Sequence, residues 1–200
     1  MNATDLFVLP KRSFHNSESW WTAFFSMWLL YESSSSNPRP LRVCNHGDDQ
    51  RFAWTGELDI TGLTAANLIS EGPLSREVFG LLEWPNSYRG LRPDVTILRP
   101  ERRTVAFIEV KTVGASVSGN VLLYEEVATH LRNLGWAADV FYLLSCGYEG
   151  NWRTVTEYKL RLILWESILQ RAKGSPLGLS LRIDLEPYSI LPAELGDHGA

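Results

Sequence analysis

Three charged residues lie at matching places in two neighbouring apolar segments. Asp94 begins the first segment, and Glu109 and Lys111 lie near the end of the second. Because side chains alternate along a strand, Glu109 and Lys111 face one side of it and Val110 faces the other. Charged groups are costly to bury, so the side that carries Glu109 must meet water, an ion or a partner.

The turn between the two segments, "RPERRT", decides which of their residues face each other. A turn centred between Glu101 and Arg102 predicts a hairpin in which Asp94 lies directly opposite Glu109, with Cβ atoms ~5 Å apart. A shift of one residue would separate the pair. Carboxylates placed in this way repel each other. A divalent cation is the simplest reason to tolerate them, and hard oxygen ligands suit Mg²⁺ or Mn²⁺.

Lys111 lies beside both carboxylates in this register. Its charged form is therefore favoured, and its pKa is not expected to fall. A charged lysine can hold an attacking water or a phosphate oxygen, and with a metal ion it can offset the negative charge that develops during displacement at phosphorus. The alternative is a weak surface ion pair between Lys111 and Glu109 or Asp94 on a solvent-facing strand.

A helix is predicted upstream of the two strands. Ser17 can cap it, and it runs to about Leu30, with Glu18 on the same stripe as Trp21 and Phe25. The apolar run at 20–31 resembles a signal peptide, but it has no convincing small-residue cleavage site and is too short to span a bilayer, which takes ~20 residues. We therefore expect a core helix and no membrane segment.

The remaining segments predict a mixture of strands and helices. Strands are expected at 51–60, 94–98, 105–111, 138–145 and 179–186, helices at 17–30, 121–134 and 154–172, a short helix at 63–70, and either type at 76–84. This order predicts an α/β (α+β) fold in which a mixed central β-sheet is flanked by helices. Residues 1–16 are expected to form an arm, 17–186 a single domain and 187–200 a flexible tail.

Composition limits the classes of function. The chain has 200 residues, 44% hydrophobic and 21% charged, which suits one soluble domain. Its net charge is −4, so a polyanion such as DNA would need a local positive patch. Arg92, Arg102 and Arg103 are candidates for that patch, and scattered surface arginines are the alternative. Cys44 and Cys146 give neither a zinc spacing nor a disulfide framework, and they fit a reducing cytoplasm.

Pro93–Asp94, followed by Glu109-Val110-Lys111, resembles the motif of the PD-(D/E)xK nuclease superfamily, which has the restriction-endonuclease-like fold. The resemblance implies a core of order αβββαβ, here with an extra C-terminal helix and strand. It also implies that Asp94 and Glu109 bind the metal ion and that Lys111 positions the nucleophilic water. Many members carry a glutamate on the first helix that completes the metal site.

Glu18 is the candidate for that first-helix glutamate, with Glu77 and Glu83 as weaker alternatives. A carboxylate that only stabilises the start of a helix is the other explanation for Glu18. "NHGDDQ" also brings together His46, Asp48 and Asp49, either as a second metal site or as a polar turn.

The helix after the lysine strand departs from the family pattern. Members often carry a Gln there, sometimes with a Tyr four residues later, but "NVLLYEEVATHLRNLG" contains no Gln. Glu126 and His130 take the equivalent places, with Tyr124 nearby, and a plain surface histidine is the alternative for His130. The departure leaves two explanations open, an altered catalytic site or a domain that binds DNA without cutting it.

These observations predict a cytoplasmic, Mg²⁺- or Mn²⁺-dependent endonuclease that hydrolyses DNA phosphodiester bonds. The partner expected is DNA, with a homodimer or other protein partners as further options and no membrane. The alternative is a catalytically inactive nuclease-fold subunit that binds DNA or protein in a larger complex. A third interpretation is a secreted or structural protein whose charged strand is a solvated edge.

Overall fold

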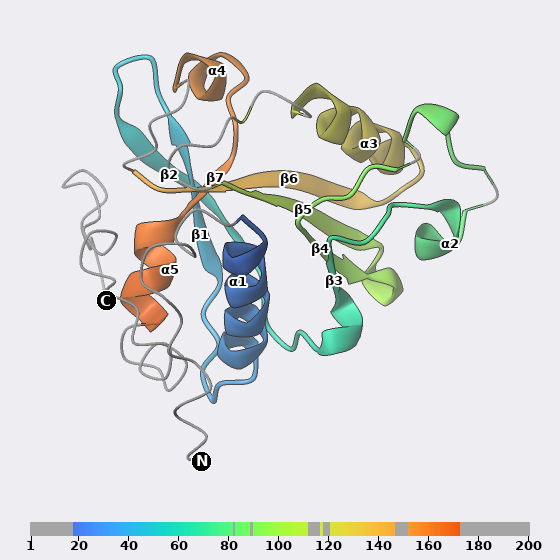
Figure 1. Cartoon of the computed structure of the whole chain (residues 1–200), viewed down its shortest axis with the longest axis horizontal. Coiled ribbons are helices and arrows are strands. Elements are labelled where there is room, and N and C mark those ends of the chain that lie inside the picture. The colour runs from blue at the N-terminus through green and yellow to red at the C-terminus, as the bar shows by residue number, and fades with distance from the viewer. Residues whose placement is uncertain are drawn as a thin grey trace.

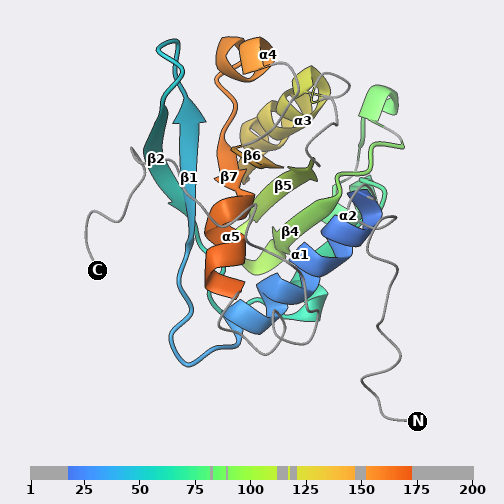
Figure 2. The same cartoon turned by 60° about the vertical axis from the view of Figure 1, so that its left-hand side comes forward.

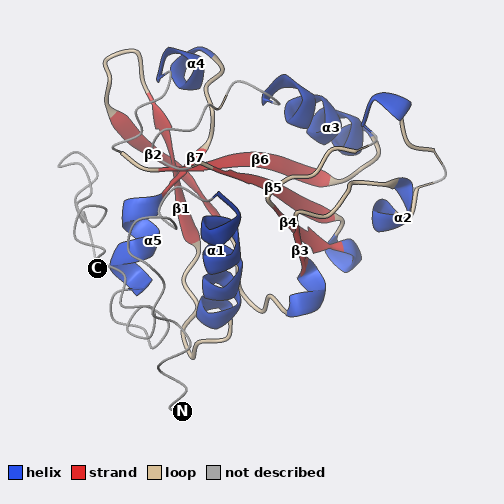
Figure 3. Ribbon diagram, in the orientation of Figure 1, coloured by secondary structure: helices blue, strands red, loops and turns tan. Residues whose placement is uncertain are grey.

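A seven-stranded mixed sheet organises the described part of the chain (Figures 1 and 3). The computed structural model describes residues 18–81, 83–88, 90–111, 117, 121–146 and 152–172. The strands follow the order β2-β1-β7-β6-β5-β4-β3 across the sheet. Their bounds are β1 Leu41–His46, β2 Phe52–Leu58, β3 Leu68–Ser70, β4 Val95–Arg99, β5 Thr104–Val110, β6 Ala137–Leu144 and β7 Leu162–Leu164. The predicted mixed α/β fold is confirmed.

Helices cover both faces of this sheet. Their bounds are α1 Glu18–Ser33, α2 Arg76–Phe79, α3 Val121–Asn133, α4 Trp152–Glu157 and α5 Trp165–Ala172. One hydrophobic layer joins α1 and α5 to the sheet, and a second layer on the other face contains α2 and α3. Figure 2 shows α1 and α3 on opposite sides of β5 and β6. Each face therefore has its own core.

The predicted core helix is α1. Its aromatic side chains Phe25 and Trp28 and the neighbouring Leu29 are fully buried against the sheet. Ser17, the predicted cap, lies outside the described residues. In the described part of the chain, no helix combines the length and apolarity that crossing a bilayer requires.

The β4–β5 hairpin has the register that the sequence predicts. Val95 pairs with Ile108 and Arg99 with Thr104, so the two strands are centred on the turn between Glu101 and Arg102. Pro100 begins a short 3₁₀ turn, and Arg103 closes it in the left-handed conformation, with φ of 50°. The next pair outward from Val95 and Ile108 is Asp94 and Glu109.

A helical crossover through α3 makes β6 parallel to β5. The register places Glu109 beside Tyr142 and Val110 beside Leu143. Gly135, with φ of 82°, ends the helix and turns the chain into β6. The predicted helix at 121–134 and the predicted strand at 138–145 are both confirmed.

The long helix predicted at 154–172 is wrong. The chain there forms α4, then strand β7, then α5. Lys159 interrupts the helix with φ of 48°, and the apolar residues Leu162–Leu164 are fully buried between β6 and β1. The period of the apolar residues suits a helix, but tertiary pairing decides the local structure.

The remaining predictions have mixed outcomes. The helix predicted at 63–70 is instead a 3₁₀ turn, Ala65–Asn67, followed by β3, while the strand predicted at 51–60 corresponds to β2. Strand β1 was not predicted. The arm at 1–16, the strand at 179–186 and the tail at 187–200 lie outside the described residues.

Candidate active site

The carboxylates Asp94 and Glu109 meet at the open end of the β4–β5 hairpin. Asp94 is the residue before β4, and its Oδ2 accepts a hydrogen bond of 2.7 Å from the backbone N–H of Val110. This bond continues the hairpin ladder through a side chain and fixes the position of the aspartate. The Glu109 side chain is 13% exposed, so both acids lie where water screens them poorly.

Burial changes the acidity of Asp94. Desolvation and the nearby charge of Glu109 raise the pKa of Asp94 to about 7, although the Val110 N–H and the Lys111 ammonium act in the opposite direction. The predicted repulsion between two facing carboxylates is therefore present at this end of the hairpin. A positive charge placed between them would relieve it.

Lys111 already supplies one such charge. Its Nζ lies 2.9 Å from Glu109 Oε1 and 3.6 Å from Glu18 Oε2. Burial favours the neutral amine, but the Glu109 carboxylate, followed by Glu18 and Asp94, raises the pKa of Lys111 above its ordinary value. The lysine is thus a charged donor, as the sequence predicts, and a poor general base.

Neighbouring elements hold the backbone of Lys111 in place. Its N–H donates to the carbonyl of Leu143 in β6 at 3.0 Å. Its carbonyl accepts from Trp165 Nε1 at 3.3 Å, at the start of α5. Glu18 comes from the first residue of α1, whose start lies beside the end of β5 in Figure 1. Four elements therefore converge on the lysine.

Two tyrosines surround the other side of Glu109. Burial, followed by the charge of Glu109, raises the pKa of both Tyr124 and Tyr142, so their hydroxyls stay neutral. Glu109 Oε2 and the Tyr142 hydroxyl are buried and have no hydrogen-bond partner among the described residues. Sequence reasoning placed Tyr124 only as a neighbour and missed Tyr142, because the pairing of Tyr142 with Glu109 depends on the β5–β6 register.

Asp94 and Glu109 fit a hard divalent cation. They provide facing carboxylates, and Glu109 contributes a buried oxygen, Oε2, for which the described residues supply no hydrogen-bond partner. Glu18 reaches the same corner, but its carboxylate contacts the ammonium of Lys111. Within the described residues, no group of three or more His, Cys, Asp or Glu side chains is arranged to hold a metal ion.

The three predicted arginines are spread over both ends of the hairpin. Arg92 is exposed and lies two residues before Asp94 in the chain, so its backbone is near the carboxylates. Arg102 and Arg103 belong to the turn at the other end of the seven-residue strand β5, on the order of 20 Å away. Arg102 Nη1 lies 3.7 Å from Asp59 there. The structure therefore brings only Arg92 near the carboxylates.

Glu126 and His130 are not brought to the carboxylates. Both line a hollow on the outer side of α3, together with Tyr88. The His130 ring contacts the rings of Trp84 and Tyr88, with centroids 6.2 and 5.8 Å away. Tyr124 of α3 lies closer to the carboxylates, since the charges of Glu109 and Asp94, after burial, raise its pKa.

The alternative acids lie elsewhere on the molecule. Glu77 and Glu83 are exposed and line a hollow beside Trp84. Asp49 accepts a hydrogen bond of 3.2 Å from the backbone N–H of Arg51, which fits a polar turn. His46 and Asp48 line a separate cavity.

Comparisons with protein-family models, with curated proteins and with solved structures find no match to this chain.

Proposed function

We propose that this protein is a metal-dependent nuclease that hydrolyses DNA phosphodiester bonds. The observation that carries the proposal is the hairpin register, which ends with the pair Val95 and Ile108, so that Asp94 and Glu109 follow directly beyond it. Two acids and the adjacent Lys111 then converge at one end of the sheet. This arrangement is the one that the resemblance to PD-(D/E)xK nucleases implies.

In this proposal Asp94 and Glu109 hold a Mg²⁺ or Mn²⁺ ion. When bound, such an ion polarises the phosphate and lowers the pKa of a water molecule. Lys111 remains charged, so it orients the attacking water or a phosphate oxygen and stabilises the negative charge that develops at phosphorus. Exposed Arg92 contacts the neighbouring phosphate backbone.

Glu18 has a positioning role in this proposal. Its carboxylate lies 3.6 Å from Lys111 Nζ. Helix α1, which carries Glu18, packs on one face of the sheet, and α3 packs on the other. Together with Glu109, Glu18 holds the ammonium at the end of β5. Because only part of the Glu18 side chain is buried, the contact can give way when a phosphate approaches.

A cleavage assay tests the proposal. Wild-type protein and Asp94→Ala are incubated with plasmid and with a single-stranded oligonucleotide, in Mg²⁺, in Mn²⁺ and in EDTA. Asp139→Ala is the matched control, because Asp139 is a partly exposed acid of β6 that pairs with Arg161, the residue before β7. Cleavage by the wild type and the control, absent in EDTA and lost in Asp94→Ala, is the expected result.

The opposite result is equally clear. If the protein binds DNA without cutting it, and neither metal nor Asp94→Ala changes the binding, the result supports a catalytically inactive binding subunit instead of a nuclease. If the protein neither cuts nor binds DNA, DNA is excluded as its substrate.

A further inference from the structure

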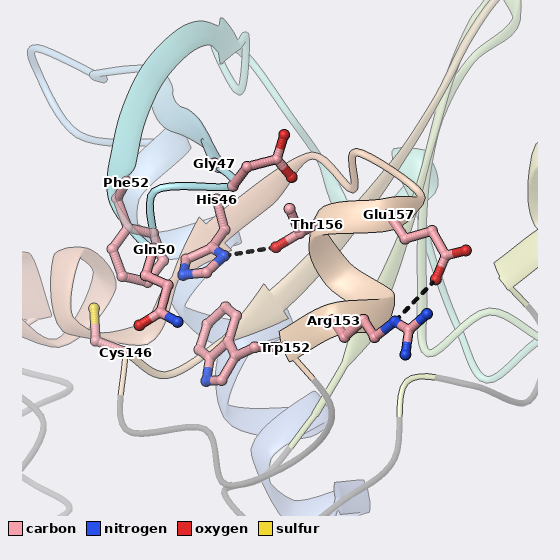
Figure 4. A pocket seen from close by; sticks show the side chains of 10 residues that line it. His46, Gly47, Gln50, Phe52, Cys146, Trp152, Arg153, Thr156 and Glu157 are labelled. Carbon is pink, nitrogen blue, oxygen red and sulfur yellow. Dashed lines mark hydrogen bonds and ion pairs between the residues drawn. The ribbon is translucent and has the colours of Figure 1, made fainter.

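A cavity lies between the tip of the β1–β2 hairpin and α4, away from the carboxylates (Figure 4). Its volume is about 680 Å³, within the range of ~300–1,000 Å³ that is usual for small-ligand sites. The described residues that line it are His46, Gly47, Asp48, Gln50, Phe52, Cys146, Trp152, Arg153, Thr156 and Glu157. The proposed nuclease mechanism uses none of them.

Three aromatic rings form one wall of this cavity. The His46 ring lies over Trp152, with centroids 4.6 Å apart and an interplanar angle of 31°. Phe52 contacts both rings edge-on, with centroids 5.1 and 5.5 Å away. The rings therefore support one another, and all three belong to residues that line the cavity, where a further planar ring can contact them.

The polar groups of the cavity can form hydrogen bonds with the edge of such a ring. His46 Nδ1 is hydrogen-bonded to Thr156 Oγ1 at 2.8 Å, which fixes the imidazole and leaves its other nitrogen pointing away from Thr156, towards Gln50 and Trp152 (Figure 4). Burial lowers the pKa of His46, so the ring is neutral at neutral pH. The Gln50 amide adds one donor group and one acceptor.

Gln50 occupies this place at a conformational cost. It has φ of 60°, a left-handed conformation that glycine adopts more easily, in the turn closed by the bond from its N–H to the Gly47 carbonyl at 3.0 Å. Gln50 is exposed and lines the cavity, so its amide is available to a ligand.

We propose that this cavity binds an unpaired nucleobase, which stacks on the aromatic wall and presents its edge to His46 and Gln50. A nucleobase is planar, neutral and bordered by alternating donors and acceptors, which matches the stacked rings and the neutral polar pair. The rim carries both signs of charge, because Asp48 and Glu157 lie there with Arg153. It therefore suits a neutral base better than a bare phosphate.

The inference deepens the proposed nuclease and rests on it for the identity of the strand that supplies the base. Cys146, in the wall of the cavity, lies four residues beyond Tyr142, the β6 partner of Glu109. That separation is on the order of 13 Å along the strand direction. A single strand whose backbone reaches the carboxylates can thus place a base a few nucleotides away in the cavity.

Binding measured without metal tests the cavity separately from the chemistry. Full-length protein carrying Asp94→Asn is titrated in EDTA against a labelled ten-residue thymidine oligonucleotide and against a blunt duplex, by fluorescence anisotropy. Trp152→Ala is expected to weaken binding of the single strand about tenfold, since base stacking contributes ~1–3 kcal/mol. Gln50→Gly removes the amide and relaxes the backbone, so it is expected to fold normally and bind about fivefold more weakly.

Glu71→Gly is the matched control for Gln50→Gly. Glu71 is an exposed residue with φ of 50° outside the described lining of the cavity, so it undergoes the same backbone change, and glycine keeps the N–H that Glu71 donates to the Asp94 carbonyl at 3.0 Å. Competition with thymidine or adenosine identifies the source of the base. A nucleoside that displaces the strand supports the pocket, and a nucleoside that binds while the strand does not supports a free nucleoside as the occupant.

Wild-type affinity in both Gln50→Gly and Trp152→Ala would overturn the inference, as would a duplex bound as tightly as the single strand. Failure of the cavity and failure of the nuclease have different signatures. If the variants show these binding changes but the wild-type protein never cuts DNA, the nucleobase pocket is supported and the nuclease proposal fails. A protein that cuts while both variants bind normally loses only the pocket.

Discussion

Lys111 is the residue on which the chemistry of the candidate site depends most directly. It is 11% exposed, and its ammonium lies between a carboxylate of its own strand and one from α1. A buried cation with two acidic partners stays protonated, so its value to a reaction is electrostatic. The same contacts make it difficult to remove without leaving Glu109 and Glu18 unbalanced.

Lys111→Met tests that role. Without the ammonium, cleavage is expected to fall at least about a hundredfold, while the Asp94–Glu109 pair still binds Mn²⁺, measured by isothermal titration. Lys159→Met serves as the control, since Lys159 is an exposed lysine in the turn after α4. A Lys111→Met protein that cuts at the wild-type rate would exclude the lysine from the mechanism.

Burial of Glu166 makes the stability of the protein depend on pH. It is 3% exposed, and its Oε1 accepts hydrogen bonds from Ser145 Oγ at 2.5 Å and from the Cys146 N–H at 2.9 Å. Burial raises the pKa of Glu166 above 4.5, so the folded protein holds this proton more tightly than the unfolded chain does. Its contribution to stability is therefore present below about pH 4.5 and is lost as pH rises through the folded pKa.

Glu166→Gln removes that titration. Its glutamine oxygen can accept the same two hydrogen bonds, so the free energy of unfolding is expected to decline less between pH 5 and pH 8 than in the wild type. Urea unfolding at the two pH values measures the difference. Glu101→Gln, at an exposed turn position, is expected to follow the wild type. A wild-type pH dependence in Glu166→Gln would mean that Glu166 is ionised in both states.

At the scale of elements, the hairpin that builds the site was predictable and the C-terminal elements were not. "RPERRT" contains the proline that starts the turn, and apolar residues on either side fix the register, so Asp94 and Glu109 could be placed opposite each other from sequence. Strand β7 could not be found in this way. It has three residues, and its strand structure comes from insertion between β6 and β1, which no local pattern records.

The helix elements show the same limit at the site. Glu18 could be assigned to the start of α1 because the helix is long and strongly apolar. Choosing among Tyr124, Glu126 and His130 required the rotation of α3 about its axis. That rotation follows from packing on the sheet, where Tyr124 is buried and Glu126 is exposed.

Arg103→Gly tests the hairpin as an element. Arg103 has φ of 50°, which glycine adopts without strain, so the variant is expected to be as stable as the wild type or up to about 1 kcal/mol more stable. Because the turn lies at the opposite end of β5 from the carboxylates, DNA affinity and cleavage should not change. Arg92→Ala, beside Asp94, is the contrasting variant and should weaken binding. A loss of DNA affinity in Arg103→Gly would mean that the turn at Arg103 does contact DNA.

In the whole molecule, two cores on opposite faces of the sheet hold Asp94 and Glu109 together, although the repulsion between their carboxylates is unfavourable. On one face, Arg171 of α5 joins Glu32 at the end of α1 and donates to the carbonyl of Arg39 at 2.8 Å, so the two helices are fixed to each other. On the other face, α3 and β6 enclose Glu109 beside Tyr142. This frame can tolerate facing carboxylates, a buried Glu109 oxygen without a partner among the described residues, and an aspartate with a raised pKa.

That balance predicts opposite effects of one substitution with and without metal. Asp94→Asn keeps an oxygen to accept the Val110 N–H and removes the repulsion with Glu109, so in EDTA its melting temperature is expected to exceed that of the wild type by a few degrees. Millimolar Mg²⁺ should raise the melting temperature of the wild type, because binding to the folded state alone stabilises it, and should leave Asp94→Asn unchanged. Asp139→Asn, whose acid pairs with Arg161, should respond to Mg²⁺ as the wild type does. A wild-type protein that Mg²⁺ and Mn²⁺ fail to stabilise, or an Asp94→Asn protein that gains as much from them, would mean that the two acids face each other for a reason other than a cation.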